Sequence, residues 1–289
     1  MKNKKRIGCL GVFLITLLLV IVIGIVILID SNTRLVTTEY KLRYDNLPAA
    51  FDGYRIVLLA DLHGAEHGEK NEKLIEQVKK AKPDIIAVAG DLLDRYQPGH
   101  NEMNQLKVIY TLIPQLTEIA PVYYVTGNHE WDSGVVRNLM DFLNEQTGVY
   151  VLQNNYKRLT KGSDSIILAG IDDPGGPADM IKPRDFIEKI INTEAPDFLA
   201  VMVHRNYNLQ MLSGLGVNLV LSGHAHGGMI RLPFTDGLIG PSHEMFPTHT
   251  SGVYKQGGTN MVVTRGLGNH LGWTRFLNNP QIVVVELGS

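Results

Sequence analysis

Five short polar motifs recur along the chain, and each one follows directly after a run of apolar residues. The apolar runs have the length and the β-branched content of buried strands, so each motif is expected where a strand ends. Loops at the carboxyl edge of an α/β sheet lie together and form binding sites. The pattern therefore predicts an α/β fold in which several loops build one polar site. The motifs are Asp61-Leu62-His63, Gly90-Asp91-Leu92-Leu93-Asp94, Gly127-Asn128-His129-Glu130, the single His204, and Gly223-His224-Ala225-His226-Gly227-Gly228.

Strands and helices are expected to alternate from residue 54 onward. The first half predicts strands at 55–60, 85–89 and 122–126 and helices at 70–80, 103–116 and 134–145. The second half has strand-length runs at 165–171, 198–203 and 219–222, with a helix at 183–191. Short runs at 229–232, 252–254, 261–264 and 282–287 suggest a mostly antiparallel end, and alternation over 35–43 suggests a first edge strand. Two sheets packed face to face and covered by helices would accommodate both halves.

Residues 7–29 contain no charged side chain. At about 1.5 Å per residue, roughly 20 apolar residues are enough for a helix to cross the hydrocarbon core of a membrane. A signal peptide would have a shorter apolar segment and a small-x-small cleavage site, and residues 27–32 offer no such site. Cys9 precedes the apolar core, which argues against a lipoprotein signal. We therefore expect an uncleaved transmembrane anchor.

The charges that flank this segment predict its orientation. Four basic residues lie within residues 1–6, and only Arg34 follows the segment closely, so the positive-inside rule places the globular part outside the cytoplasm. Cys9 is the only cysteine, and a globular part without cysteine suits that location. The expected organisation is a cytoplasmic basic tail (1–6), a transmembrane anchor (7–29), a juxtamembrane segment (30–52) and one globular domain (53–289).

The charge of the globular part excludes one class of partner. Without the four basic residues of the tail, the chain has 23 Lys and Arg against 29 Asp and Glu, a net charge of −6. A mildly acidic domain lacks the basic surface that nucleic-acid binding requires, so we expect no nucleic-acid partner. The sequence does not indicate the oligomeric state.

The side chains of the motifs suit divalent cations. Asp61 and His63 stand two residues apart, so both can point to the same side of an extended segment. The carboxylate of Asp91 has two oxygens and can bridge two cations, which then lie about 3.5–4 Å apart. Asn128 supplies an amide oxygen and His204 an imidazole. A set of oxygen and nitrogen ligands without thiolate suits manganese, iron or zinc.

The order and spacing of the five motifs resemble the calcineurin-like metallophosphoesterase superfamily. The resemblance covers residues 54–287 and implies a four-layer α/β/β/α metallophosphoesterase sandwich, here with an N-terminal transmembrane helix. It also implies two metal ions, with a bridging hydroxide as the nucleophile that attacks phosphorus. The implied ligands are Asp61, His63, Asp91 and His226 for the first metal and Asp91, Asn128, His204 and His224 for the second.

Three further residues receive roles from the resemblance. His129, which directly follows Asn128, would be the general acid that protonates the leaving oxygen. Asp94 would hold the His129 imidazole oriented and charged. Arg95 would match the phosphate-binding arginine of the phosphoprotein phosphatase branch, although that branch continues with glycine where this chain has Tyr96. A surface ion pair is the alternative for Asp94 and Arg95.

A finer resemblance comes from the last third of the chain. The segment 222–228, then Arg231-Leu232-Pro233, then Thr264-Arg265-Gly266-Leu267-Gly268 look like the bacterial membrane-associated phosphodiesterase branch that includes UDP-2,3-diacylglucosamine pyrophosphatase-type enzymes. In this reading Arg265 could bind a substrate phosphate, and the alternative is a β-turn with a surface arginine. His243 or His249, in the loop between 232 and 252, could also touch substrate.

Several functions stay open. The first is a membrane-anchored phosphoesterase that hydrolyses a phosphodiester or pyrophosphate, with a lipid or cell-envelope phosphate as the substrate. A broad-specificity phosphomonoesterase is a second, a metal-binding scaffold without turnover is a third, and a structural anchor protein is a fourth. The complete ligand set and the intact His129 argue against the scaffold.

Overall fold

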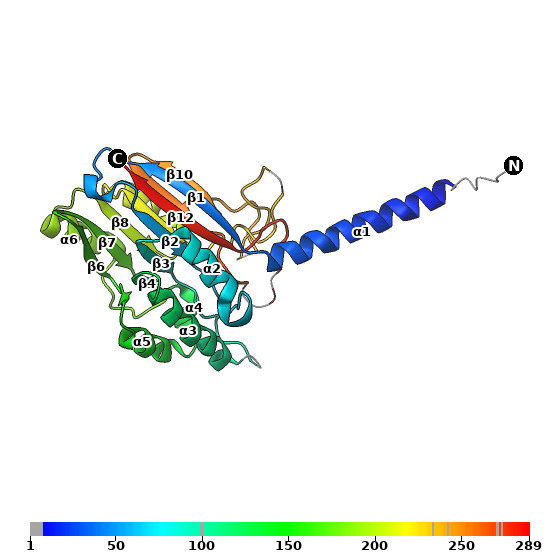
Figure 1. Cartoon of the computed structure of the whole chain (residues 1–289), viewed down its shortest axis with the longest axis horizontal. Coiled ribbons are helices and arrows are strands. Elements are labelled where there is room, and N and C mark those ends of the chain that lie inside the picture. Colours follow the sequence, from blue (N-terminus) through cyan, green and yellow to red (C-terminus); the bar gives the residue numbers. More distant parts are fainter. Residues whose placement is uncertain (1–7, 99–100, 233, 242, 270–271, 273) are drawn as a thin grey trace.

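The strands form two six-stranded sheets (Figure 1). The structure, a computed structural model, describes residues 8–98, 101–232, 234–241, 243–269, 272 and 274–289. The basic tail at residues 1–6, the first residue of the predicted anchor, and Pro233 lie outside the described residues. The first sheet has the order β1 (Val36–Arg43), β12 (Gln281–Gly288), β2 (Arg55–Leu59), β3 (Ile85–Ala89), β4 (Val122–Val125) and β5 (Val149–Val151). The second has the order β10 (Gly252–Gln256), β11 (Thr259–Val263), β9 (Leu219–Ser222), β8 (Leu199–Val203), β7 (Asp164–Ile171) and β6 (Asn155–Lys161).

Three apolar cores hold four layers together. One core joins the first sheet to the helices α2 (Glu72–Ala81), α3 (Glu102–Thr117) and α5 (Val136–Glu145). The second lies between the sheets, and the third joins the second sheet to α6 (Pro183–Glu194) and α7 (Leu209–Ser213). The predicted four-layer α/β/β/α sandwich is therefore confirmed. Short 3₁₀ turns at Ala49–Phe51, Glu69–Asn71 and Asn206–Asn208 complete the elements.

The burial of each strand follows from its place in this sandwich. Every residue of β3 and β8 is buried, because one face packs on the other sheet and the other face on helices. β1 instead alternates between partly buried and exposed side chains, as an edge strand does. It pairs with β12 in parallel, so the predicted juxtamembrane segment contributes a strand to the first sheet.

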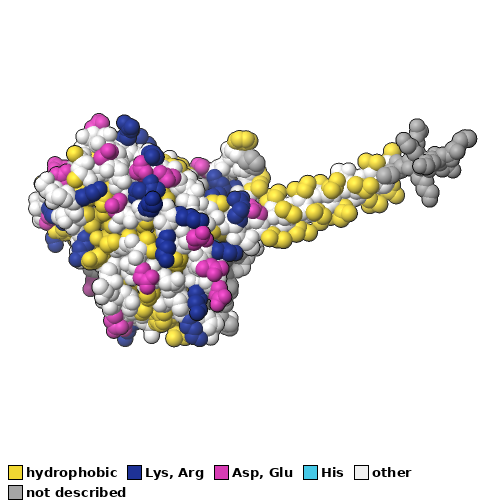
Figure 2. Space-filling view, in the orientation of Figure 1, with side chains coloured by type: hydrophobic (Ala, Val, Ile, Leu, Met, Phe, Trp, Pro, Cys, Tyr) yellow, Lys and Arg dark blue, Asp and Glu magenta, His cyan; other side chains and the backbone are white. Residues whose placement is uncertain are grey.

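The helix α1 (Cys9–Thr33) is long and apolar enough to cross a membrane. Figure 1 shows it projecting from the domain, and Figure 2 shows hydrophobic side chains along its length. The side chains in its most apolar window are not buried by the rest of the protein. The helix continues past Ile29, where the charge-free run ends, and its last turn contacts the domain.

Two sequence predictions about the C-terminal part are wrong. Residues 229–232 form only isolated bridges, with Ile239 and Phe276, and not a strand. Met229 adopts a left-handed φ of 31°, which a regular strand does not accommodate. The end of the chain is also mixed and not mostly antiparallel. β10 pairs with β11 and β12 pairs with β2 in antiparallel fashion, whereas β11 runs parallel to β9 and β12 runs parallel to β1. A short helix α4 (Asn128–Asp132), which no periodic pattern predicts, follows β4.

Candidate metal centre

The five motifs start at the ends of five strands that lie at one edge of the two sheets. Asp61 and Asp91 follow β2 and β3 of the first sheet, while His204 follows β8 of the second. Asn128 begins α4 after β4, and His224 follows β9. The parallel order of β2, β3 and β4 and of β8 and β9 brings these ends to the same side. As expected, the motifs build one site from both sheets.

Asp61, His63 and His226 form the first group of convergent side chains. Their ligand atoms all lie within 4.8 Å of one another, and all three residues are buried. The Nε2 atoms of His63 and His226 are 3.1 Å apart, and His226 Nε2 is 3.8 Å from Asp61 Oδ1. This is the set predicted for the first metal, apart from Asp91.

Asp91, His204 and His224 form the second group. His204 Nε2 lies 3.1 Å from Asp91 Oδ2, and His224 Nδ1 lies 3.2 Å from His204 Nε2. The same carboxylate oxygen of Asp91 is 3.9 Å from His63 Nε2, which belongs to the first group. Asp91 therefore stands between the two groups, as a bridging ligand must.

The donor atoms fit divalent cations. The side-chain oxygen of Asn128, Oδ1, is buried and has no hydrogen-bond partner among the described residues. His204 bonds the carbonyl oxygen of Ala89 through Nδ1 at 2.7 Å, so its other nitrogen is directed into the site. The ring nitrogens of His63 and His226 lie 3.1 Å apart and those of His204 and His224 lie 3.2 Å apart, close enough for each pair to share one cation. Carboxylate, amide and imidazole ligands without sulfur match the metals predicted from the sequence.

The three side chains of the second group have pKa values shifted in different directions. Burial alone would raise the pKa of Asp91, but His204 and the other histidines around it hold that pKa well below its ordinary value. Burial lowers the pKa of His204 less than Asp91 raises it, and the result is a pKa of about 10. Burial and the nearby His204 lower the pKa of His224 to about 3, so His224 is neutral and can offer a lone pair to a cation.

The backbone of the site is strained. Five of the seven predicted ligands adopt the left-handed conformation, which costs a non-glycine residue of order 1–3 kcal/mol and persists where the surroundings enforce it. Such strain clusters at sites where several side chains must converge. The residues and their φ angles are Asp61 (52°), His63 (47°), Asp91 (53°), His224 (71°) and His226 (47°).

Two glycines allow the ligand loops to approach one another. A Cβ atom on Gly127 would lie 2.1 Å from Asp91 Oδ1, and one on Gly90 would lie 2.6 Å from the backbone nitrogen of Gly127. Gly90 also has a φ of 85°, which side chains rarely permit. These glycines place the loops of Asp91 and Asn128 in direct contact.

Glu130 holds the loops of Asp91 and Asn128 together, a role that the sequence analysis did not predict. Its buried carboxylate accepts hydrogen bonds from the backbone nitrogens of Asp91 at 2.8 Å, Leu93 at 3.0 Å and Gly127 at 2.6 Å. Burial and the neighbouring Asp91 raise the pKa of Glu130 to about 7. The only sequence signal was a glutamate three residues after a glycine that precedes a helix.

His129 and Asp94 form a hydrogen-bonded pair beside the two groups. His129 Nδ1 lies 2.7 Å from Asp94 Oδ1, and His129 Nε2 lies 3.9 Å from Asp91 Oδ2. Burial lowers the pKa of His129, but the hydrogen bond to Asp94 and the charges of Asp91 and Asp94 outweigh it, so the pKa is raised overall. The protonated form of the imidazole is therefore favoured, and its Nε2 faces Asp91.

A cavity of about 180 Å³ opens onto the site. Asp91, Asn128, His129, His224 and His226 line it together with two arginines. One is Arg95, at the place predicted from the sequence. The other is Arg205, which the sequence analysis missed although it directly follows His204. Its guanidinium is fixed by Asp173, with Nε 2.7 Å from Oδ2 and Nη2 3.0 Å from Oδ1.

Arg265 does not line this cavity. Its side chain lies behind the ligand loop, where a Cβ on Gly227 would approach the Arg265 Cγ to 2.7 Å. Burial and the nearby Arg231 lower the pKa of Arg265 to about 10. The structure thus does not bring Arg265 together with the other predicted site residues.

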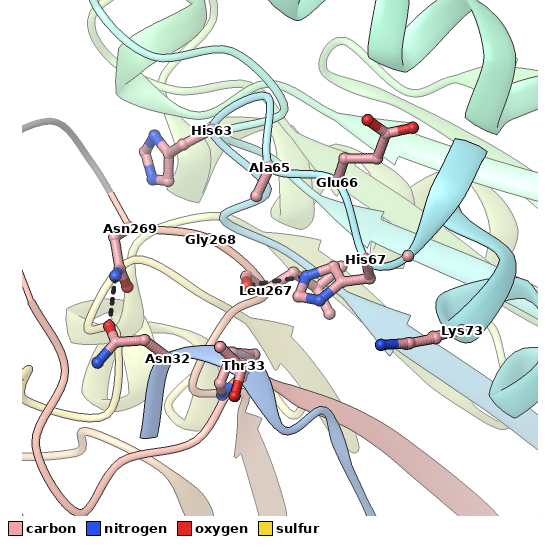
Figure 3. A pocket seen from close by; sticks show the side chains of 12 residues that line it. Asn32, Thr33, His63, Ala65, Glu66, His67, Lys73, Leu267, Gly268 and Asn269 are labelled. Carbon is pink, nitrogen blue, oxygen red and sulfur yellow. Dashed lines mark hydrogen bonds between the residues drawn. The ribbon is translucent and has the colours of Figure 1, made fainter. Parts of the chain in front are cut away.

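A second cavity, of about 350 Å³, adjoins His224. Its wall includes Tyr207, Met245 and Phe246, all of which are exposed, and His249. A third, of about 480 Å³, lies between the end of α1 and His63 (Figure 3). The candidate metal ligands are therefore flanked by a recess of mixed polarity on one side and by a polar recess at the end of α1 on the other.

Comparison with known proteins gives the same family as the motifs. The family described as calcineurin-like phosphoesterase matches residues 54–228. An uncharacterized metallophosphoesterase of Bacillus subtilis is 30% identical over 88% of this chain and 85% of its own length. A transmembrane protein with a metallophosphoesterase domain from Danio rerio is 26% identical over 75% of this chain, which spans about half of that longer protein. A dimetal phosphatase structure from Danio rerio covers 74% of this chain and 88% of its own, at 11% identity and a TM-score of 0.46.

Proposed function

Since this chain belongs to the calcineurin-like phosphoesterase family and is a metal-dependent phosphoesterase, we propose that it hydrolyses phosphodiester or pyrophosphate bonds from a membrane anchor. The observation that carries the proposal is the convergence of two groups of candidate metal ligands beside a hydrogen-bonded His129–Asp94 pair. Asp91, Asn128, His129, His224 and His226 open onto one cavity there. A metal-binding scaffold without turnover would not need the His129–Asp94 pair.

The proposed ligands divide into two sets that share Asp91. Two cations, which could be manganese, iron or zinc, would supply a water of lowered pKa and would neutralise negative charge on the phosphoryl group. The residues around them orient the substrate and move protons. The proposed sets are Asp61, His63, Asp91 and His226 for one cation and Asp91, Asn128, His204 and His224 for the other.

His129 is the proposed general acid. Because Asp94 accepts the proton of Nδ1, the ring is held with Nε2 towards the cavity, and Nε2–H can donate to the leaving oxygen. Proton donation at this point is required for a poor leaving group such as an alkoxide.

Arg205 and Arg95 are the proposed phosphate-binding residues, and Arg205→Ala tests the better positioned of the two. A charged hydrogen bond contributes about 1.5–3 kcal/mol, so the substitution is expected to lower kcat/KM by roughly 10- to 150-fold, chiefly through KM. Steady-state kinetics on a phosphodiester would measure this, with bound metal quantified in the same samples. Arg158→Ala, which breaks a surface pair with Glu194, is the control. Unchanged KM in the Arg205 variant would remove it from the phosphate site.

An apolar substituent on the substrate is the second part of the proposal. The recess beside His224 has Met245 and Phe246 in its wall, which suits an acyl chain or another apolar group. Leu232 and Phe234, on the same loop between β9 and β10, are exposed. Figure 1 places this loop, in yellow and orange, at the end of the domain from which α1 leaves. These features support a lipid or cell-envelope phosphate as the substrate.

A substrate panel tests the proposed reaction. The purified full chain with Mn²⁺ would be given bis(p-nitrophenyl) phosphate, p-nitrophenyl phosphate, a nucleotide diphosphate ester and a phospholipid in mixed micelles. We expect hydrolysis of the diester or pyrophosphate substrates and its loss with EDTA. Preference for the monoester would favour a broad-specificity phosphomonoesterase, and no turnover of any substrate by metal-loaded protein would favour a scaffold.

The proposed topology places the globular part outside the cytoplasm. The proposal rests on the apolar helix α1 and on the basic residues that precede it in the sequence. A reporter that is active only after export, fused after Ser289, is therefore expected to be active in cells. A reporter that works only in the cytoplasm should be silent at the same position. The reverse pair of results would invert the topology and exclude an extracytoplasmic substrate.

A further inference from the structure

Asn32, in the last turn of α1, is fully hydrogen bonded at the junction with the domain. Its Nδ2 donates to the carbonyl oxygens of Leu28 at 2.7 Å and Arg275 at 2.9 Å. Its Oδ1 accepts from Asn269 Nδ2 at 2.9 Å and from the backbone nitrogen of Arg275 at 3.0 Å. An asparagine side chain has two donor hydrogens and one acceptor oxygen with two lone pairs, so this junction uses all of them. Figure 3 shows the contact with Asn269.

Arg275 continues the network from Asn32 into the protein. Its side chain is completely buried, and burial lowers its pKa to about 9. Its Nε donates to Asn269 Oδ1 at 2.6 Å, and Nη2 donates to the carbonyl oxygen of Gly268 at 2.7 Å. No ion pair joins Arg275 to a carboxylate within the described part of the chain. A buried cation whose hydrogen-bond partners are neutral is costly, which indicates that its position has a structural role.

The guanidinium of Arg275 ends against the metal ligand His226. Nη1 lies 3.4 Å from the carbonyl oxygen of His226, and Nη2 lies 3.4 Å from its ring nitrogen Nδ1. The same carbonyl oxygen accepts a shorter bond of 2.7 Å from Asn278 Nδ2. His226 has a left-handed φ of 47°, so its conformation depends on neighbours that hold this peptide in place. Arg275 contacts both the peptide carbonyl and the imidazole ring of His226.

We propose that the end of the membrane anchor is a structural part of the metal centre, with Asn32 and Arg275 acting as positioning residues that hold His226 in its ligating orientation. The path is Asn32 to Arg275 to His226, and each link is a direct contact. The inference rests on the proposed metal site but not on the substrate or on catalysis.

A second contact between anchor and domain provides a comparison within the same molecule. Asn279 Nδ2 donates to the carbonyl oxygen of Asp30 at 2.7 Å and to its carboxylate at 3.1 Å. Arg34 also binds the Asp30 carboxylate. This contact fixes the anchor to the domain without contacting the loop of His226. Loss of either contact should weaken the attachment of α1 to the domain. Only loss of the Asn32 contact should also disturb the position of His226.

The coupling is reciprocal. If the seated anchor increases the affinity of the first metal site, then binding of the metal must stabilise the seating of the anchor by the same factor. The polar cavity between Asn32 and His63 opens beside this junction, so both partners of the coupling face the same recess (Figure 3).

The test is Mn²⁺ binding to the full chain in lipid nanodiscs, with wild type, Asn32→Ala, Asn279→Ala and His226→Ala compared. Residues that orient a metal ligand typically affect metal affinity by about 10- to 100-fold. We expect Asn32→Ala to weaken the affinity of one of the two sites for Mn²⁺ by that factor. Asn279→Ala should leave the Mn²⁺ affinities of both sites unchanged. At limiting Mn²⁺, electron paramagnetic resonance should show less of the coupled two-metal signal in the Asn32 and His226 variants but not in the Asn279 variant. The double variant Asn32→Ala/His226→Ala should lose no more Mn²⁺ affinity than His226→Ala alone, because both substitutions act on the same metal site.

Equal affinities in Asn32→Ala and wild type would overturn the proposal, as would equal losses in Asn32→Ala and Asn279→Ala. Asn32→Leu, which keeps the approximate size of the side chain but removes its donors and its acceptor, serves as a second variant and should behave like Asn32→Ala. Thermal unfolding of the metal-free proteins identifies any general loss of stability. Since the readout is metal binding, an absence of phosphodiester hydrolysis would refute the proposed function without affecting this result.

Discussion

Asp91→Asn is expected to lose both metal ions and to reduce turnover more than any other single substitution in the site. Asparagine keeps the shape of the side chain and can still accept the 2.9 Å hydrogen bond from the backbone nitrogen of His129. It removes the negative charge and the second anionic oxygen that two adjacent cations share. Metal ions contribute several kcal/mol of charge stabilisation in the transition state, so activity should fall by about 10³-fold or more. Elemental analysis and diester kinetics on the same sample would measure both effects.

His226→Ala is the matched comparison for Asp91→Asn. His226 belongs only to the first group, so its loss should weaken one cation and leave the second in place. Two tightly bound cations in the Asp91 variant would contradict the bridging role. Equal metal loss in the two variants would contradict the division of the ligands into two sets.

His129→Ala is expected to separate substrates by their leaving groups. An alkoxide must be protonated as it departs, whereas nitrophenolate is stable enough to leave without a proton. General acid catalysis contributes about 10²- to 10⁴-fold, so most of that factor should be lost on alkyl phosphodiesters and far less on nitrophenyl ones. Metal content should stay unchanged, because His129 is not one of the proposed ligands. Paired kinetics on one alkyl and one nitrophenyl substrate would measure the difference.

Asp94→Asn should reproduce the His129→Ala pattern in milder form. The amide can still accept a hydrogen bond from Nδ1, but it lacks the charge that helps to raise the pKa of His129. Equal losses on both substrate types in the His129 variant would instead assign that residue to phosphate binding or to support of the metals.

The sequence predicted the convergence of the polar motifs better than it predicted the C-terminal fold. The motifs were recognisable because each follows a buried strand whose apolar run is short and clear, as at Asp61 and Asp91. Parallel strands then bring such ends together whatever the details of the loops. Residues 229–232 also have an apolar pattern, but the left-handed Met229 after two glycines prevents a strand. Local backbone conformation of this kind has no periodic signature.

Supporting residues were missed because their partners are distant in sequence. Glu130 contacts Asp91 and Leu93, and Arg205 is fixed by Asp173. Arg275 meets Asn32 across more than two hundred residues. None of these pairs produces a motif, so only the folded chain brings them together. Conversely, Arg265 has the right chemistry and packs against a glycine-rich ligand loop, yet it does not line the cavity at the candidate ligands.

The most direct test of the central claim is an anomalous difference map from crystals of the Mn²⁺-loaded protein. The proposed site predicts two peaks with Asp91 between them. One should lie among Asp61, His63 and His226, and the other among Asn128, His204 and His224. A single peak in this region, or two peaks bound by other residues, would contradict the two-metal centre on which the proposed function depends.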